Sequence, residues 1–229
     1  TMKKLLLLIA AVASLASCVQ NIEGVDTSLG YTTITVGMPE SRTSLGAKEN
    51  GIYAIYWSEG DQIVVNGAAS TRMERGENKK SATFHFEGSL LVPPYNLTYP
   101  YTENSACAEG KPTVVFAANQ EYVANSFGVG YAPMCGYIES GEASMQHLAG
   151  VLQFKVKGTN KLSTIEIVAE EDKVLAGEFD VDCKEATISP ITATTTNTIT
   201  YTANQVLTAN GTTFHITVPK GIDGVCKVV

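Results

Sequence analysis

Short runs of apolar residues, many of them alternating with polar ones, recur along most of the 229-residue chain. In the clearest run, Leu152, Phe154 and Val156 alternate with residues that are mostly polar. Such alternation places the two sets of side chains on opposite faces of a β-strand. No stretch has a long helical period, and Gly, Pro and Asn separate the runs, so the pattern predicts an all-β fold made of β-sandwiches. The main predicted strands are residues 31–36, 63–65, 84–86, 95–101, 114–116, 151–157, 162–168, 174–181 and 214–218.

Residues 52–67 are expected to organise the core, because they contain the only tryptophan, Trp57, between two strand-like runs. The segment between the runs has turn residues: Gly60 tolerates a positive φ, and Asp61 can hydrogen-bond its own downstream backbone. Asn66-Gly67 is a second turn signal of the tight kind. The sequence therefore predicts that the two runs form a hairpin, with Trp57 as the largest side chain of the core.

The N-terminus has the features of a bacterial lipoprotein signal. Lys3 and Lys4 precede an apolar segment that is too short to span a membrane as a helix. Residues 15–18, Leu-Ala-Ser-Cys, resemble the lipobox, in which a signal peptidase cuts before a cysteine that carries diacylglycerol. We therefore expect residues 1–17 to be a signal peptide and Cys18 to be lipidated, with cleavage at an ordinary site as the alternative. Several acyl chains would anchor the protein firmly, whereas one chain binds a membrane only marginally.

Turn signals divide the rest of the chain. Residues 18–28 are mostly polar and without pattern, and are expected to form a lipidated tether. Turn residues near 140–142 predict a boundary between an N-terminal β-sandwich domain, residues 29–141, and a C-terminal one, residues 142–229. Val225–Val229 resembles a strand that the end of the sequence interrupts, so we expect the C-terminal domain to be incomplete.

Composition narrows the range of partners. Hydrophobic residues make up 44% of the chain and charged residues 17%, which is enough apolar surface for a folded core. The net charge is −7, and loss of the signal would remove two lysines and leave the mature chain more acidic. Nucleic acids and anionic lipid surfaces attract basic proteins, so neither electrostatic partner is expected.

Residues with catalytic or metal-binding potential are scattered. His85, His147 and His215 each lie more than four residues from any other histidine or cysteine, which gives no zinc-site spacing. His85 and His215 occupy polar positions of alternating strands and are expected to face solvent. The carboxylates within residues 180–185 lack the spacing of an EF-hand, and no nucleophile elbow or phosphate-binding glycine loop is present. We therefore expect no enzymatic activity, no metal and no cofactor.

Apart from Cys18, the chain has four cysteines: Cys107, Cys135, Cys183 and Cys226. Export would permit disulfides, and four cysteines allow three pairings that the sequence does not separate. Buried reduced thiols are the equal alternative, because the chain lacks a dense cysteine framework.

Several segments, in order along the chain, resemble the fimbrillin family, the surface lipoproteins and pilus subunits of the Bacteroidales type. The first is Trp-Ser-Glu-Gly-Asp-Gln-Ile-Val-Val at residues 57–65, with Trp57, Gly60 and Asp61 as the core of the motif. The others are residues 41–43, 82–88, 99–101, 119–122, 146–156 and 177–182. The resemblance implies two transthyretin-like β-sandwich domains in tandem. It also implies a pilus (fimbria) subunit, or an anchored or tip adhesin, lipid-anchored at the outer membrane and cell surface, with other subunits and a host or bacterial surface ligand as partners.

The resemblance further implies a route of assembly. In pilins of this type a protease cuts the loop after the first strand, and a strand of the next subunit fills the groove that opens. The first predicted strand here is residues 31–36, and Arg42-Thr43 follows it in a loop rich in Pro, Ser, Gly and charged residues. Many family members stay uncut, so an uncut anchored or tip subunit is the alternative to a processed shaft subunit.

Two other functions compete with a role in pili. A surface glycan-binding lipoprotein would use aromatic rings as platforms for sugars, and the candidates are Tyr53, Tyr56, Trp57, Tyr99 and Tyr101. Such platforms must face solvent, whereas core rings must be buried. A secreted hydrolase is the third possibility, and no catalytic constellation supports it.

The lipidation of Cys18 can be tested directly. The Cys18→Ala variant should lose its acyl chains and leave the membrane fraction, because the remaining chain has no other predicted anchor. Membrane partitioning and labelling with a clickable fatty acid measure this. Unchanged partitioning together with unchanged labelling would contradict the prediction.

Overall fold

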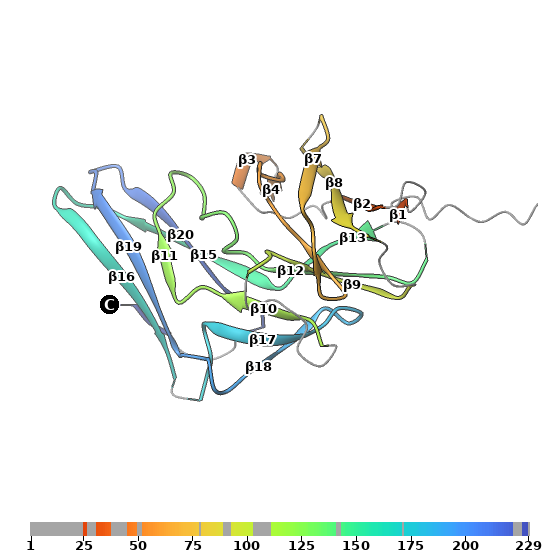
Figure 1. Cartoon of the computed structure of the whole chain (residues 1–229). Helices are drawn as coiled ribbons and strands as arrows, with labels where there is room; N and C mark the ends of the chain where they lie inside the picture. The colour runs from red at the N-terminus through yellow and green to blue at the C-terminus, as the bar shows by residue number, and fades with distance from the viewer. Residues whose placement is uncertain are drawn as a thin grey trace, which may run out of the picture.

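The computed structural model describes residues 25–26, 31–37, 45–49, 52–77, 79–88, 93–102, 111–140, 143–170, 172–221 and 226–228. Among these residues every regular element is a β-strand, and no helix occurs (Figure 1). The prediction of an all-β fold of sandwich type is therefore confirmed. The strands gather into two groups of sheets, and each group surrounds its own hydrophobic cluster.

Two sheets form the N-terminal group. The first has the order β1-β2-β8-β7, and β13 pairs with β2 as well. Its strands are β1 (Val25–Asp26), β2 (Tyr31–Gly37), β7 (Arg72–Arg75), β8 (Ser81–Glu87) and β13 (Ala143–Ser144). The second has the order β14-β12-β9-β5-β6. Its strands are β5 (Val64–Val65), β6 (Ala68–Ala69), β9 (Tyr95–Tyr99), β12 (Met134–Ile138) and β14 (Gln146–His147).

Side chains of both sheets fill the first cluster, which includes Ile34, Trp57, Phe84, Leu97 and Met134. Burial of this apolar surface is the main force that holds the two sheets together. β3 (Leu45–Glu49) and β4 (Ile52–Ile55) form a further antiparallel pair. Among the described strands they pair only with each other.

Three sheets form the C-terminal group, with the orders β11-β19-β16-β21, β10-β17-β18 and β15-β20. Their strands are β10 (Thr113–Phe116), β11 (Asn119–Glu121), β15 (Ala149–Val156), β16 (Lys161–Ala169), β17 (Gly177–Asp182), β18 (Thr187–Pro190), β19 (Thr198–Val206), β20 (Thr212–Pro219) and β21 (Cys226–Val228). They enclose the second cluster, which includes Phe116, Ile167, Phe179, Tyr201 and Phe214.

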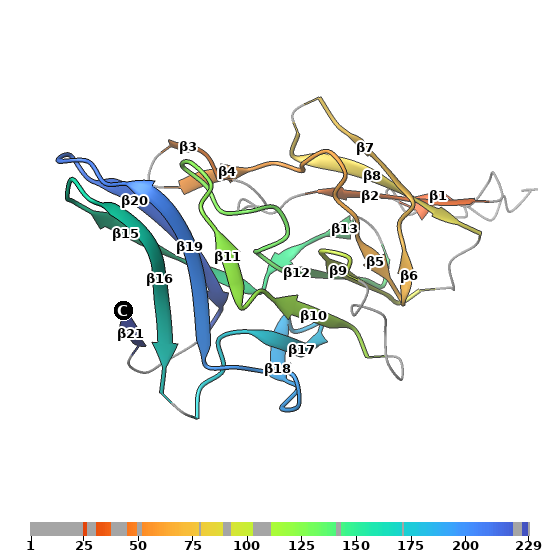
Figure 2. The ribbon, with the colours of Figure 1, turned by 60° about the vertical axis from the view of Figure 1, so that its left-hand side comes forward.

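The two groups do not divide the chain at one point. β10 and β11 precede the expected boundary at residues 141–142, yet they pair with β17 and β19. β13 and β14 follow that boundary and pair with β2 and β12. Figure 2 shows β9, β10 and β12 in the middle of the molecule, between the two groups. The strand pairings therefore cross the predicted boundary from both sides.

The hairpin expected within residues 52–67 is not formed. The first run becomes β4 and pairs with β3, whereas β5, in the second run, pairs with β6 and β9. The Asn66-Gly67 signal is confirmed, since these residues have φ angles of 46° and 87° and connect β5 to β6. Local sequence thus identified the strands and one turn, but the partner of each strand is chosen by tertiary packing.

Both ends of the described chain are paired. Val25 and Asp26, within the segment expected to be a tether, form β1 and pair with Ile34 and Thr33 of β2. At the other end, β21 forms where the sequence predicted a strand, and it pairs with β16.

The first cluster should respond strongly to the loss of one ring. Phe84→Ala removes a fully buried side chain and should lower the free energy of unfolding by about 3–5 kcal/mol. Val206→Ala, at an exposed position of β19, is the control and should change it by less than about 0.5 kcal/mol. Urea unfolding measures both. A loss below about 1 kcal/mol for Phe84→Ala would show that this ring is not part of a packed core.

Candidate functional site

The strand that the sequence singled out for exchange, β2, lies inside its sheet. Along one edge it pairs with β8 over its whole length, from Tyr31 opposite Glu87 to Gly37 opposite Ser81. Along the other edge, β1 pairs antiparallel with its middle and β13 pairs parallel with its end. Most of the backbone of β2 is therefore bound on both sides.

One face of β2 is part of the first cluster. Thr32, Ile34 and Val36 are fully buried, and Ile34 lies opposite Phe84 of β8. Full burial of one such aliphatic side chain stabilises a fold by about 1.5–3 kcal/mol. The Thr32 hydroxyl adds a hydrogen bond to the carbonyl of Gly88 at 3.2 Å. β2 is thus held by apolar burial as well as by its ladder.

The other face of β2 is more polar. The hydroxyls of Thr35 and Thr83 are hydrogen-bonded to each other at 2.9 Å, and the ring centroids of Tyr31 and His85 are 6.0 Å apart. The alternation of β2 therefore places Thr35 on the outer face. Thr32 lies on the inner face with Ile34 and Val36.

Trp57 connects the core beneath β2 to the second sheet. Its ring meets Phe84 edge-on at 4.8 Å between centroids and Tyr99 at 5.5 Å. Such T-shaped pairs contribute about 0.5–1.5 kcal/mol beyond area burial. The backbone of Trp57 is fixed by hydrogen bonds to the Lys79 carbonyl, at 2.9 Å, and from the Arg75 guanidinium, at 3.3 Å. The prediction that Trp57 is a core residue is confirmed.

The rest of the motif, Gly60 and Asp61, forms the turn that positions Trp57. Gly60 has φ +85°, as its turn role requires. The buried Asp61 carboxylate accepts hydrogen bonds from the Ser58 N–H at 2.7 Å and from the Tyr99 hydroxyl at 2.8 Å. Asp61 was expected to bond its downstream backbone. It bonds upstream instead, and also to a strand 38 positions away.

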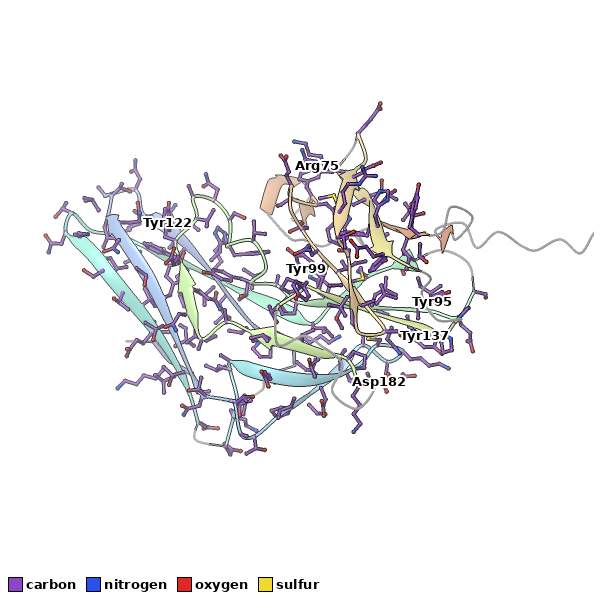
Figure 3. The ribbon with its side chains drawn as sticks, in the orientation of Figure 1. Arg75, Tyr95, Tyr99, Tyr122, Tyr137 and Asp182 are labelled. Atoms are coloured by element: carbon purple, nitrogen blue, oxygen red, sulfur yellow. The ribbon has the colours of Figure 1, made fainter. Side chains whose placement is uncertain are left out.

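Burial shifts the titration of both partners in this bond. The pKa of Asp61 is raised above its ordinary value, because desolvation of the charged form outweighs the hydrogen bonds from Ser58 and Tyr99 and the charge of Arg75. The pKa of the Tyr99 phenol is also raised, first by burial and then by the Asp61 charge. Figure 3 shows Tyr99 deep in the middle of the molecule. The Tyr99 phenol therefore keeps its proton and donates it to an Asp61 carboxyl oxygen, which suits a structural bond.

A cavity of about 370 Å³ adjoins Asp61. Its walls include Gln62, Tyr101, Val115 and Tyr131, so both strand groups contribute to it. Tyr101 is 38% exposed at this place.

The glycan platform expected from five aromatic residues is not formed as predicted. Trp57 and Tyr99 are buried, so neither ring can offer a face to a sugar. Tyr101 is exposed and Tyr56 is half-buried. The side chain of Tyr53 lies outside the described residues.

The expected solvent-facing histidines differ from each other. His85 is half-buried on β8, with its Nε2 3.3 Å from a Glu74 carboxylate oxygen. His215 was predicted wrongly: it is only 3% exposed, and its Nε2 lies 2.9 Å from the Gln153 amide nitrogen. Burial lowers the pKa of His215. In the described part of the chain, no three His, Cys, Asp or Glu side chains are grouped so that they could hold a metal ion.

Three predicted site residues lie outside the described residues: Cys18, Arg42 and Thr43. The structure therefore leaves lipidation and processing as predictions. Within the described ranges, no helix combines the length and the hydropathy that crossing a membrane requires.

The comparisons with known proteins add no relative to this picture. No family model, no curated protein and no solved structure matches the chain.

The buried Asp61 should make stability depend on pH. A carboxyl whose folded pKa is raised contributes its full stability below its unfolded pKa, about 3.9, and loses it as pH rises through the folded pKa. Relative to Asp61→Asn, the wild-type protein should therefore become less stable as pH rises above about 4, until the folded pKa is passed.

Urea unfolding at a series of pH values between about 4 and 7 measures this difference. Asp172→Asn, at an exposed position, is the control and should show no such trend. A difference between wild type and Asp61→Asn that stays constant over the series would contradict the assigned desolvation.

Proposed function

We propose that this protein is a non-enzymatic, fimbrillin-like surface lipoprotein that serves as a pilus subunit or as an anchored or tip adhesin. The observation that carries the proposal is β2, an inner strand near the N-terminal end of the described chain whose apolar side chains are part of the first cluster. The segment with Arg42-Thr43 follows it directly in the sequence. The burial of Trp57 and Tyr99 favours this function over a glycan platform made of these rings.

The physical basis of assembly is strand replacement. If β2 left, the backbone groups of β8 would lose their partners from Ser81 to Glu87, and the space of Ile34 and Val36 would open beside Phe84. Unpaired backbone groups and an empty apolar groove are unfavourable until another strand fills them. A strand from a neighbouring subunit with the same alternation would restore both.

The strength of the β2 ladder constrains how exchange can occur. A cut after Arg42 alone leaves β2 bound by its hydrogen bonds and its buried side chains. Release therefore requires a donor strand that competes for the same positions. Cleavage followed by release of β2 would also separate the remainder from a lipid at Cys18, as a shaft subunit requires, whereas an uncut chain would stay anchored.

An arginine-specific protease tests the exchange. It should cut the mature protein after Arg42, and Arg42→Ala should resist this cut. Arg72 and Arg75 provide internal controls, because they lie in β7, which pairs with β8, and a paired strand is a poor protease substrate. Intact mass identifies the cut, and size-exclusion chromatography with light scattering follows assembly.

Two labelled peptides test whether another strand can take the place of β2. A peptide with the sequence of residues 30–38 should bind the cut protein in place of β2, and the same peptide with Ile34→Asp should not, because a charge would enter the apolar groove. Polymerisation after cleavage would support a shaft subunit. Resistance at Arg42, or a cut monomer that keeps β2 and takes up neither peptide, would contradict strand exchange.

A further inference from the structure

Two cysteines that are distant in sequence meet between the two strand groups. Cys135 lies on β12 of the N-terminal group, and Cys183 directly follows β17 of the C-terminal group. They are 0% and 2% exposed, and both are reduced thiols that belong to the second cluster. Each thiol is a hydrogen-bond partner of the other. The Cys183 thiol also lies 3.5 Å from the carbonyl oxygen of Leu97 on β9, the strand next to β12.

The surrounding contacts hold the two elements in this arrangement. The Asp182 carboxylate accepts the backbone N–H groups of Lys184 and Glu185, both at 3.0 Å, which fixes the turn that begins with Cys183. The Lys184 ammonium lies 5.5 Å from the ring centroid of Tyr137 on β12. Figure 3 shows Tyr137 and Asp182 close together in the lower part of the molecule. The contact between Lys184 and Tyr137 thus also joins the turn after β17 to β12, beside the two thiols.

A groove lies beside one of the two cysteines. It has a volume of about 380 Å³ and is lined by Asn96, Lys111, Asp182 and Cys183, among others, and Cys135 is not part of its wall. A reagent that enters this groove is therefore next to the residue Cys183, which is hydrogen-bonded to Cys135.

The electrostatic setting of the reduced pair favours ionisation of one thiol. The pKa of Cys135 is lowered, chiefly by the hydrogen bond with Cys183 and also by the charge of Lys220, against the opposing effects of burial and Asp182. The thiolate is the nucleophile in thiol–disulfide exchange, so the lower pKa favours the first step of such an exchange in the reduced pair.

We propose that Cys135 and Cys183 form a disulfide that ties β12 of the N-terminal group to the turn after β17 in the C-terminal group. The oxidant is a disulfide: a thiol oxidase of the exported compartment, or a small-molecule disulfide. The thiolate of one of the two cysteines attacks it and forms a mixed disulfide, which releases one thiolate of the oxidant. The thiolate of the other cysteine then attacks the protein sulfur of the mixed disulfide and releases the second, so that two thiols lose two protons and two electrons while one disulfide is reduced to two thiols.

Peptide mapping of the full chain tests the pairing. The purified protein is incubated with oxidised glutathione, quenched with N-ethylmaleimide under denaturing conditions and digested with chymotrypsin without reduction. Chymotrypsin separates Cys107 from Cys135, because Phe116 and Tyr131 lie between them. The expected product is a peptide pair linked through Cys135 and Cys183. Alkylation of both thiols in the oxidised sample, or linkage of either one to Cys107 or Cys226 instead, would overturn the proposal.

Stability supplies a second measurement. In a Cys107→Ser/Cys226→Ser background, reduction with dithiothreitol should lower the Tm of the oxidised protein by about 5–15 °C, since the bond closes a long loop. The same treatment of a variant that also carries Cys183→Ser should leave Tm unchanged. An equal response of the two proteins would contradict a stabilising tie.

In cells, formation of the disulfide depends on export of the protein, and export is part of the proposed function. Oxidation of the purified protein does not depend on export. A pair that is linked after glutathione treatment but reduced in protein from cells would support the pairing and contradict export. A pair that stays unlinked in purified protein would contradict the disulfide alone.

Discussion

The packing of Trp57 against Phe84 and Tyr99 is the contact on which the N-terminal group depends. Phe84 belongs to the sheet of β2, and Tyr99 belongs to the opposite sheet, so one indole bridges both layers. The buried bond between Asp61 and Tyr99 fixes the turn that holds this indole in place. Because Ile34 lies opposite Phe84, the same cluster forms the floor beneath β2. The motif and β2 are therefore parts of one structural unit.

This arrangement gives each of the tryptophan, the glycine and the aspartate of the motif a structural role. Trp57 supplies apolar area, Gly60 permits the turn, and Asp61 replaces the hydration that its neighbours lose on burial. A buried carboxylate is unfavourable unless it is hydrogen-bonded, and here both of its oxygens have donors. The energetic disadvantage of burying this carboxyl group is thus offset by a firmly positioned ring.

Local sequence predicted the strands well, because alternation is a property of neighbouring residues. The stripe at Tyr95, Leu97 and Tyr99 became β9, and Asn66-Gly67 became a tight turn. Strand partners were not predictable in this way, because β4 and β5 were expected to pair with each other and pair with other strands instead. The bond between Asp61 and Tyr99 also escaped prediction, because it joins residues 38 positions apart and neither residue alone signals it.

His215 shows a different limit of the same reasoning. Alternation on β20 predicted one face in contact with solvent, but Thr217 on that face is buried. Its hydroxyl lies 3.2 Å from Gln120 Oε1, at β11, and 2.6 Å from the Tyr131 carbonyl oxygen. There the Gln120 amide donates to the Thr217 carbonyl at 2.8 Å and accepts its N–H at 2.9 Å, so a side chain takes the place of a neighbouring strand. A polar residue in an alternating strand faces solvent only where no other segment packs on that face of the strand. Whether one does depends on the tertiary structure.

The position of the cysteine pair limits what strand exchange could disturb. Cys135 lies in the sheet that contains β9 and β12, whereas β2 lies in the other sheet of the same group. A bond between Cys135 and Cys183 would hold β12 against the C-terminal group while β2 is replaced across the core. The rings of Trp57 and Tyr99 would then stay with the tied sheet, because Tyr99 is on β9 and β9 pairs directly with β12. Replacement of β2 could therefore proceed as a local change at one face of the core, with the junction between the two groups unchanged.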